Sequence, residues 1–175
     1  FFFVMIVLGV NQGMQPIAGF NFGAKHYTRL NQVLKYAITI ATGIWIVGFI
    51  VCVLLATPVA SAFTNDEELL KEAAHALRVM NLVVPIIGFQ MITIGFFQSI
   101  GKAGISIFLS LTRQLLFLVP LLLILPNFFG LEGIWYSVPI ADGTSAITAA
   151  IVLIYHMRKF KMRGKLENSN LQTEI

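Results

Sequence analysis

The chain has 175 residues, of which 57% are hydrophobic and only 11% are charged. Soluble domains are about 45–50% apolar and about 25% charged, and one core of this size cannot hide so much apolar surface. The composition therefore excludes a soluble globular domain, a disordered chain and a dedicated nucleic-acid-binding protein, and it predicts an integral membrane protein. The single cysteine, Cys52, excludes a disulfide framework and a CxxC metal site.

Five segments are apolar over the roughly 20 residues that a helix needs to cross a bilayer. They lie at about residues 1–22, 36–63, 77–100, 105–125 and 133–157. We expect residues 1–163 to form an all-α, polytopic membrane bundle and residues 164–175 to form a polar, disordered cytoplasmic tail. Because the chain starts with Phe1 inside an apolar run, we also expect further helices to precede it.

The first segment contains residues that are unusual in a membrane span. Asn11 and Gln15 are four residues apart and share a helix face, whereas Asn21 follows Pro16, which lacks an N–H group and is expected to bend the helix. Two G-x-x-x-G patterns allow close helix approach: Gly9–Gly13 and Gly19–Gly23. These residues favour equally a packing helix with hydrogen bonds to its neighbours and a bent helix that lines a polar cavity.

The third segment, residues 77–100, repeats this pattern. It carries Pro85, Gln90 and Gln98, and we expect Pro85 to free a backbone carbonyl and bend the span. Helix packing and the lining of a polar cavity are again equal alternatives.

Two ionisable residues lie deep in the last two segments. Asp142 is about 14 Å into its segment, and Arg113 is about 12 Å into the preceding one from the opposite side, at 1.5 Å per residue. The short connection makes these segments antiparallel neighbours, so the two depths agree to within about 5 Å of a 30 Å bilayer. We therefore predict an Arg113–Asp142 pair, because an unpaired charge at this depth is costly. It is either a static clamp or a switch that protonation of Asp142 or cation binding would open.

Lys and Arg residues predict the orientation, because they gather in cytoplasmic connections. Those in the first and third connections and the tail are Lys25, Arg29, Lys35, Lys102, Arg158, Lys159, Lys161, Arg163 and Lys165. The other side carries Lys71, with Arg78 at its border, and the acids Asp66, Glu67, Glu68, Glu72 and Glu132. We expect the first group, with the C-terminus, in the cytoplasm.

Catalytic and metal-binding motifs are missing from the sequence. His26, His75 and His156 lie near segment ends without H-E-x-x-H spacing, and there is no G-x-S-x-G elbow, P-loop or G-x-G-x-x-G run. We therefore expect no enzyme activity, no metal site and no cofactor.

Two runs resemble signatures of multidrug and toxic compound extrusion (MATE) transporters. The first is Gln15, Pro16, Phe20, Asn21, Phe22, Gly23 and Ala24, which is similar to the run that closes the eighth of twelve helices in that family. The second has the residue order of the last two helices: Arg113, Gln114, Pro120, Pro126, Gly130, Gly133, Trp135, Pro139, Ala141 and Asp142.

This resemblance implies five helices of the C-terminal six-helix lobe of a twelve-helix transporter. It implies a multi-pass antiporter of a bacterial inner membrane that exports drug-like, often cationic organic compounds in exchange for H⁺ or Na⁺. The implied partners are the lipid bilayer, small organic substrates and the N-terminal lobe of the same parent chain, with no nucleic acid.

The carboxylates that couple ions in known members fall outside this sequence or are not matched in it, so Asp142 is a candidate on physical grounds alone. A lipid-linked oligosaccharide flippase of the same superfamily is the alternative; its pyrophosphate ligand needs several cavity cations, of which this sequence offers Arg113. An intramembrane enzyme or a structural subunit is a more distant alternative.

Overall fold

The computed structural model describes residues 2–55 and 83–173, with a few scattered positions between 58 and 79, and only the backbone from residue 161 onward. This part of the chain contains helices and no strand, as the long apolar segments predict. The helices are α1 (Phe2–Gly23), α2 (Tyr27–Leu54), α5 (Val84–Ser99), α6 (Ala103–Leu111), the π-helical η1 (Thr112–Leu118), α7 (Val119–Phe129) and α8 (Leu131–Thr173).

Four helical stretches are long and apolar enough to cross a membrane. They are Phe2–Gly23, Tyr27–Leu54, the continuous run Ala103–Phe129 and Leu131–Phe160. Among the described residues, α5 has 16 residues and is about 24 Å long, shorter than the hydrocarbon core. The first part of the expected span 77–100 and the acidic connection lie largely outside the described residues.

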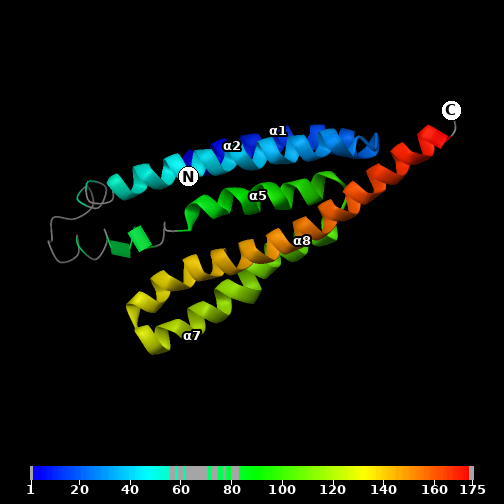
Figure 1. The fold of residues 1–175 in the computed structure, drawn as a ribbon. Coiled ribbons are helices and arrows are strands. Elements are labelled where there is room, and N and C mark those ends of the chain that lie inside the picture. The colour runs from blue at the N-terminus through cyan, green and yellow to red at the C-terminus, as the bar shows by residue number, and fades with distance from the viewer. Residues whose placement is uncertain are drawn as a thin grey trace.

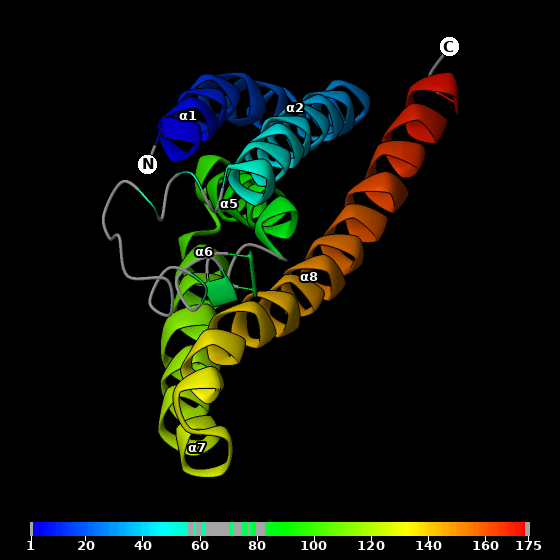
Figure 2. The same ribbon diagram turned by 90° about the vertical axis from the view of Figure 1, so that its left-hand side faces the viewer.

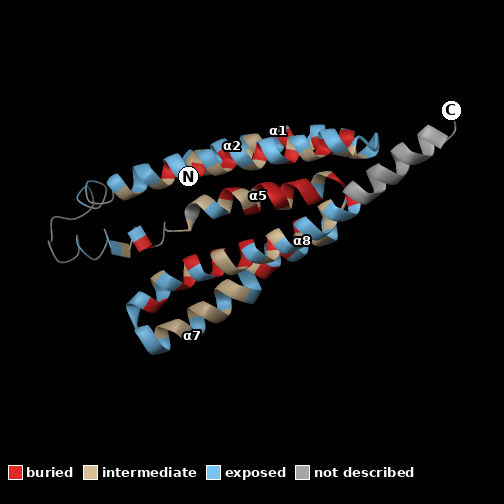
Figure 3. Ribbon diagram, viewed as in Figure 1, coloured by how far each residue is buried: buried red, intermediate tan, exposed pale blue. Residues whose placement is uncertain are grey.

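Helix α5 is the centre of the described bundle and packs against α1, α2, α6 and α8. Figure 1 shows α1 and α2 side by side above α5, and Figure 2 shows the same grouping from a second direction. The α6–α7 rod and α8 form a hairpin that meets the rest of the bundle along α5. Burial follows this arrangement, because buried positions concentrate on α5 while α7 has none (Figure 3).

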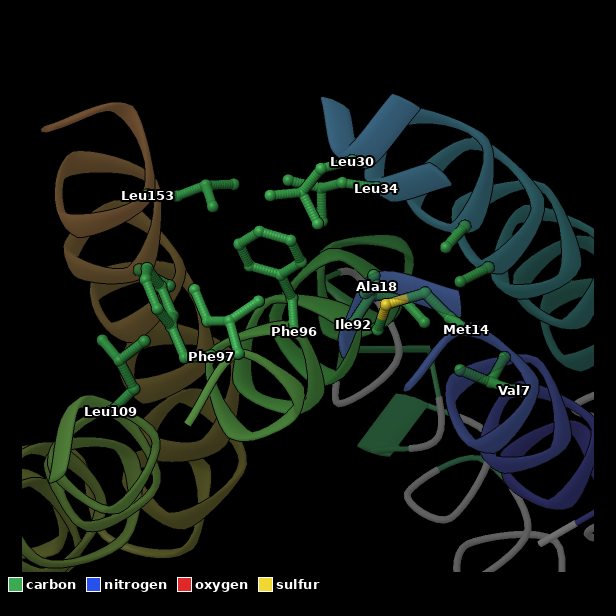
Figure 4. Close-up of a cluster of buried hydrophobic side chains, with 14 of the residues drawn as sticks. Val7, Met14, Ala18, Leu30, Leu34, Ile92, Phe96, Phe97, Leu109 and Leu153 are labelled. Atoms are coloured by element: carbon green, nitrogen blue, oxygen red, sulfur yellow. The ribbon is translucent and has the colours of Figure 1, made fainter. Parts of the chain in front are cut away.

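The hydrophobic core joins the four elements that surround α5. Phe96 and Phe97 of α5 are fully buried between Leu30 of α2, Leu109 of α6 and Leu153 of α8 (Figure 4). Large aromatic side chains in such positions contribute most of the packing energy because they remove the largest apolar area from exposure. The core therefore fixes the α1–α2–α5 group against α8.

Two turns at the same end of the bundle close in the same way. After α1, the N–H of His26 donates to the Asn21 carbonyl at 2.8 Å, and after α5 the N–H of Lys102 donates to the Phe97 carbonyl at 2.9 Å. The residue before each donor has a positive φ, 56° for Lys25 and 74° for Gly101. This is the Schellman motif, in which glycine is preferred because it has no Cβ.

Several expected boundaries differ from the structure. Helix α2 spans Tyr27–Leu54 and thus begins before the expected residue 36, because residues 27–35 contain no helix breaker although they are too polar for the hydrocarbon core. The expected end at residue 63 lies outside the described residues. The segments expected at 105–125 and 133–157 extend to Ala103–Phe129 and Leu131–Thr173. The last helix thus continues into the tail that we expected to be disordered, because extending an existing helix costs far less than starting one.

The first helix and the third segment also differ in detail from the expectation. Nothing described lies within 4 Å of a Cβ built at Gly9, Gly13 or Gly23, so of the two G-x-x-x-G patterns only Gly19 makes a close contact, 3.0 Å from the Ser99 carbonyl oxygen. Pro85 lies at the start of α5, where a missing N–H costs nothing, instead of inside a longer helix.

Candidate functional site

The ion pair predicted between the last two segments is present in the structure. Arg113 Nε donates to Asp142 Oδ1 at 2.7 Å and joins η1 to α8. The Asp142 side chain is 7% exposed, whereas that of Arg113 is 36% exposed. A charged hydrogen bond of this length is among the stronger polar contacts in proteins. Loss of the arginine would be costly, because the buried carboxylate would then be left without its partner.

Arg113 lies in a π-helical segment that the sequence analysis missed. In η1 the backbone hydrogen bonds span one residue more than in an α-helix, and the N–H of Val119 donates to the carbonyl of Gln114, five residues back. Pro120 follows immediately and explains this longer span, because its ring clashes with the carbonyl four residues earlier and it has no N–H to donate. Short π-helical segments are frequent at functional sites. The sequence signal that could have predicted this segment was Pro120, which follows a deeply placed arginine by seven residues.

The three polar candidates of α1 differ in their surroundings. Asn21 is buried, and its amide Nδ2 donates to the carbonyl of Ile17 at 2.8 Å, so its polarity is satisfied within its own helix. Asn11 is half-buried and its Oδ1 has no hydrogen-bond partner among the described residues. A Cβ built at Gly95 would overlap this Oδ1, which places the Asn11 amide directly on α5. Gln15 is half-buried.

The proline candidate of α1 and the two glutamines of α5 occupy different surfaces. Pro16 is exposed inside an uninterrupted α1, and Gln98 is exposed on α5. Gln90 is 2% exposed, and among the described residues neither its Oε1 nor its Nε2 has a hydrogen-bond partner. Gln90 and Gly95 are about 140° apart around α5, so the amides of Gln90 and Asn11 face different sides of that helix.

Buried polar atoms without partners are rare, because each costs about 1–3 kcal/mol. Asn11 and Gln90 are therefore the candidates whose hydrogen-bonding capacity is left for a ligand, for water or for a further segment of protein. Among the described residues, no three His, Cys, Asp or Glu side chains gather in a way that could hold a metal ion.

Comparisons with known proteins agree with this architecture. A family model described as MatE matches residues 1–124. The chain is 25% identical over 154 residues to the multidrug export protein MepA of Staphylococcus aureus, and 23% identical to MepA of Staphylococcus haemolyticus. The first alignment covers 88% of this chain and 34% of the relative, so the chain spans about a third of the length of the curated relatives that it matches.

Solved structures match over most of the chain. The MATE multidrug transporter DinF-BH has a TM-score of 0.84 at 40% identity, covering 91% of this chain and 35% of that one. An inward-facing MATE family transporter has a TM-score of 0.85 at 25% identity, and the match covers 92% of this chain and 38% of that one. An outward-facing one has a TM-score of 0.81 at 26% identity, and the match covers 89% of this chain and 36% of that one. The expected membrane helical bundle is thereby confirmed.

Proposed function

The chain belongs to the MatE family, and from this premise we propose that it forms part of a secondary active transporter that exports drug-like organic compounds. The proposal is supported by the names of its relatives, a multidrug export protein and a MATE multidrug transporter. The long apolar helices and the polar residues set among them are consistent with it. Substrates that are organic cations, exchanged for H⁺ or Na⁺, are part of this proposal.

The pair of Arg113 and Asp142 is the proposed ion-responsive element, and its geometry is the single observation that carries this assignment. A buried carboxylate whose described partner is one half-exposed guanidinium changes its interaction strongly when it takes up a proton or lies beside a cation. Uptake of the ion would weaken the attraction between η1 and α8. A transporter needs such a difference in ion affinity between its two access states.

The proposed orientation places the α1–α2 turn, the α5–α6 turn and the end of α8 on the cytoplasmic side of a bacterial inner membrane. These three parts lie toward the same end of the molecule (Figure 1). They carry Lys25, Lys102 and Arg158, as the positive-inside rule requires. The N-terminal lobe of the parent chain is the proposed partner across the substrate cavity.

Substrate contacts are proposed for the polar residues whose hydrogen-bonding capacity is unmet, Asn11 and Gln90. Gln15 and Gln98 are proposed as further cavity residues, and Pro16 and Pro85 as positions at which α1 and α5 bend or end during transport. Asn21 is proposed to keep the end of α1 in shape, because its amide bonds to its own helix.

The test is dye efflux in everted vesicles that contain the complete parent protein. Ethidium or another fluorescent lipophilic cation is loaded, and H⁺ and Na⁺ gradients are imposed separately on wild type, Asp142→Asn and Glu132→Gln. Glu132 is an exposed carboxylate on the same helix and is the matched control. We expect gradient-driven movement in wild type and Glu132→Gln, and its loss in Asp142→Asn at normal expression.

Each other result changes one part of the proposal. Efflux that survives in Asp142→Asn would keep the transporter and make the ion pair structural. No gradient-driven movement of any organic cation by the wild type would contradict multidrug export, and the lipid-linked oligosaccharide flippase would be tested next.

A further inference from the structure

A groove between α2 and α8 lies away from the residues assigned to transport. It has a volume of about 300 Å³ and is lined by Asn31, Leu153, Ile154, Met157 and Arg158. Leu153 forms its buried side and faces Leu30 and Leu34 of α2 (Figure 4). The groove is therefore an open gap between two long apolar helices, with an apolar side at Leu153.

The lining of the groove changes from apolar to cationic along α8. Leu153, Ile154 and Met157 are followed by Arg158, which is exposed. The described carboxylate nearest in sequence is Asp142, about 24 Å back along the helix at 1.5 Å per residue. Arg158 thus has no carboxylate near it among the described side chains. Asn31 adds an amide donor from α2 on the opposite wall.

The position of Arg158 corresponds to the boundary between hydrocarbon and water. The apolar residues of α8 give way to the basic residues Arg158 and Lys159, and residues 27–35 at the start of α2 are too polar for the hydrocarbon core. Arginine side chains near the ends of spans extend to the headgroup region while their stems stay on apolar surface. The groove therefore spans the depth at which a phospholipid places its phosphate and the first part of its chains.

We propose that this groove binds one phospholipid with an anionic headgroup. Its acyl chain lies on Leu153, Ile154 and Met157, its phosphate accepts hydrogen bonds from the Arg158 guanidinium, and the Asn31 amide donates to the headgroup. Charge complementarity selects the lipid, because Arg158 lines the groove and Arg29 and Lys35 add further cations at this end of the bundle. Basic clefts between transmembrane helices bind anionic headgroups in this way. This site is separate from the proposed substrate and ion sites.

The experiment uses the complete parent protein in detergent and native mass spectrometry with dioleoyl phosphatidylglycerol or dioleoyl phosphatidylcholine. Arg158→Gln removes the groove cation, and Lys159→Gln is the matched control, because it removes the same charge about 100° further around α8. One cation near a headgroup contributes about 1 kcal/mol, so we expect about five-fold weaker phosphatidylglycerol binding in Arg158→Gln. Lys159→Gln should stay within two-fold of wild type, and phosphatidylcholine binding should be weaker in wild type and unchanged by either variant.

A second variant, Asn31→Trp, fills the groove without changing charge. Loss of phosphatidylglycerol binding with an unchanged unfolding temperature would support the site. The proposal is overturned if both lipids bind wild type equally, if Lys159→Gln weakens binding as much as Arg158→Gln, or if soluble glycerophosphate displaces the lipid. It is also overturned if wild type binds neither lipid and Asn31→Trp unfolds at a lower temperature, because a further segment of the parent chain would then occupy the groove.

Discussion

The two regions that meet at α5 are held together by different kinds of contact. In the α1–α2–α5 group the helices meet at glycines, and a Cβ at Gly88 or Gly95 would overlap a neighbouring side chain. In the hairpin of α6–α7 and α8, no residue of α7 is buried. Gly133 packs on the Leu125 carbonyl beside the connecting turn, and further along the hairpin an ion pair joins η1 to α8. Close steric fit allows one arrangement, whereas an ion pair can be made and broken by a proton or a cation. The hairpin is therefore the region better suited to respond to an ion.

Breaking the ion pair on one side should have the largest effect. Arg113→Gln leaves the buried Asp142 carboxylate without its partner, and we expect the free energy of unfolding of the parent protein to fall by about 3 kcal/mol, the lower end for a buried pair because Arg113 is 36% exposed. The double variant Arg113→Gln, Asp142→Asn should recover most of this loss. Chemical unfolding in detergent measures both values, and equal losses in Arg113→Gln and the double variant would show that the unpaired Asp142 carboxylate is not the cause of the loss.

Crowding a glycine contact should have the next largest effect, and it tests the other region. A Cβ at Gly88 would lie 2.5 Å from Trp45 Cδ1 and 2.9 Å from the Ala41 carbonyl oxygen, which is backbone and cannot turn away. We expect Gly88→Ala to lower the free energy of unfolding by about 2 kcal/mol. Gly43→Ala on α2 is the control, because nothing lies within 4 Å of its Cβ. If both variants are equally stable, the α2–α5 contact is looser than the structure places it.

Much of this comparison could be predicted from the sequence, because it depends on local signals. Apolar length predicted the four long helical stretches, and the matching depths of Arg113 and Asp142 predicted their contact. The glycine contacts could not be predicted in the same way. Gly9 and Gly13 have the same spacing as Gly19 and Gly23, yet only Gly19 meets a neighbouring helix, because the crossing point depends on how α1 and α5 pack.

Other features were missed because two local preferences compete. The boundary between polar and apolar residues near Tyr36 indicates where the hydrocarbon begins, but α2 starts at Tyr27 because helix formation continues into the polar region. For Asn21, a polar residue in a span, the sequence favoured equally a packing role and a place in a polar cavity, and the structure shows its amide bonded to Ile17 of its own helix. Polarity in a span therefore indicates a site only where the packing leaves the polar atoms without local partners.

A smaller effect, of the opposite sign, is expected at a buried amide. Gln90→Leu removes two polar atoms that have no partner among the described residues, and we expect it to raise the free energy of unfolding by about 1 kcal/mol. Gln98→Leu, on the exposed side of the same helix, should change it by less than about 0.5 kcal/mol. Chemical unfolding and dye efflux are measured on the same variants. We expect Gln90→Leu to export less dye than wild type and to unfold at a higher denaturant concentration. A stability loss in Gln90→Leu would show that the amide has partners elsewhere in the parent protein.

The smallest effects are expected at the joint between the two regions, where two glycines three residues apart should respond with opposite signs. Gly101 has φ of 74° and Gly104 lies in α6, and nothing lies within 4 Å of a Cβ at either position. Gly101→Ala should therefore lower the free energy of unfolding by about 1 kcal/mol through backbone strain alone. Gly104→Ala should raise it by up to about 1 kcal/mol, because alanine has the higher helix propensity. Thermal unfolding of the two variants side by side measures the difference. Equal shifts in unfolding temperature would mean that Gly101 does not hold the left-handed conformation. The α5–α6 turn would then leave the hairpin free to change its angle to the α1–α2–α5 group.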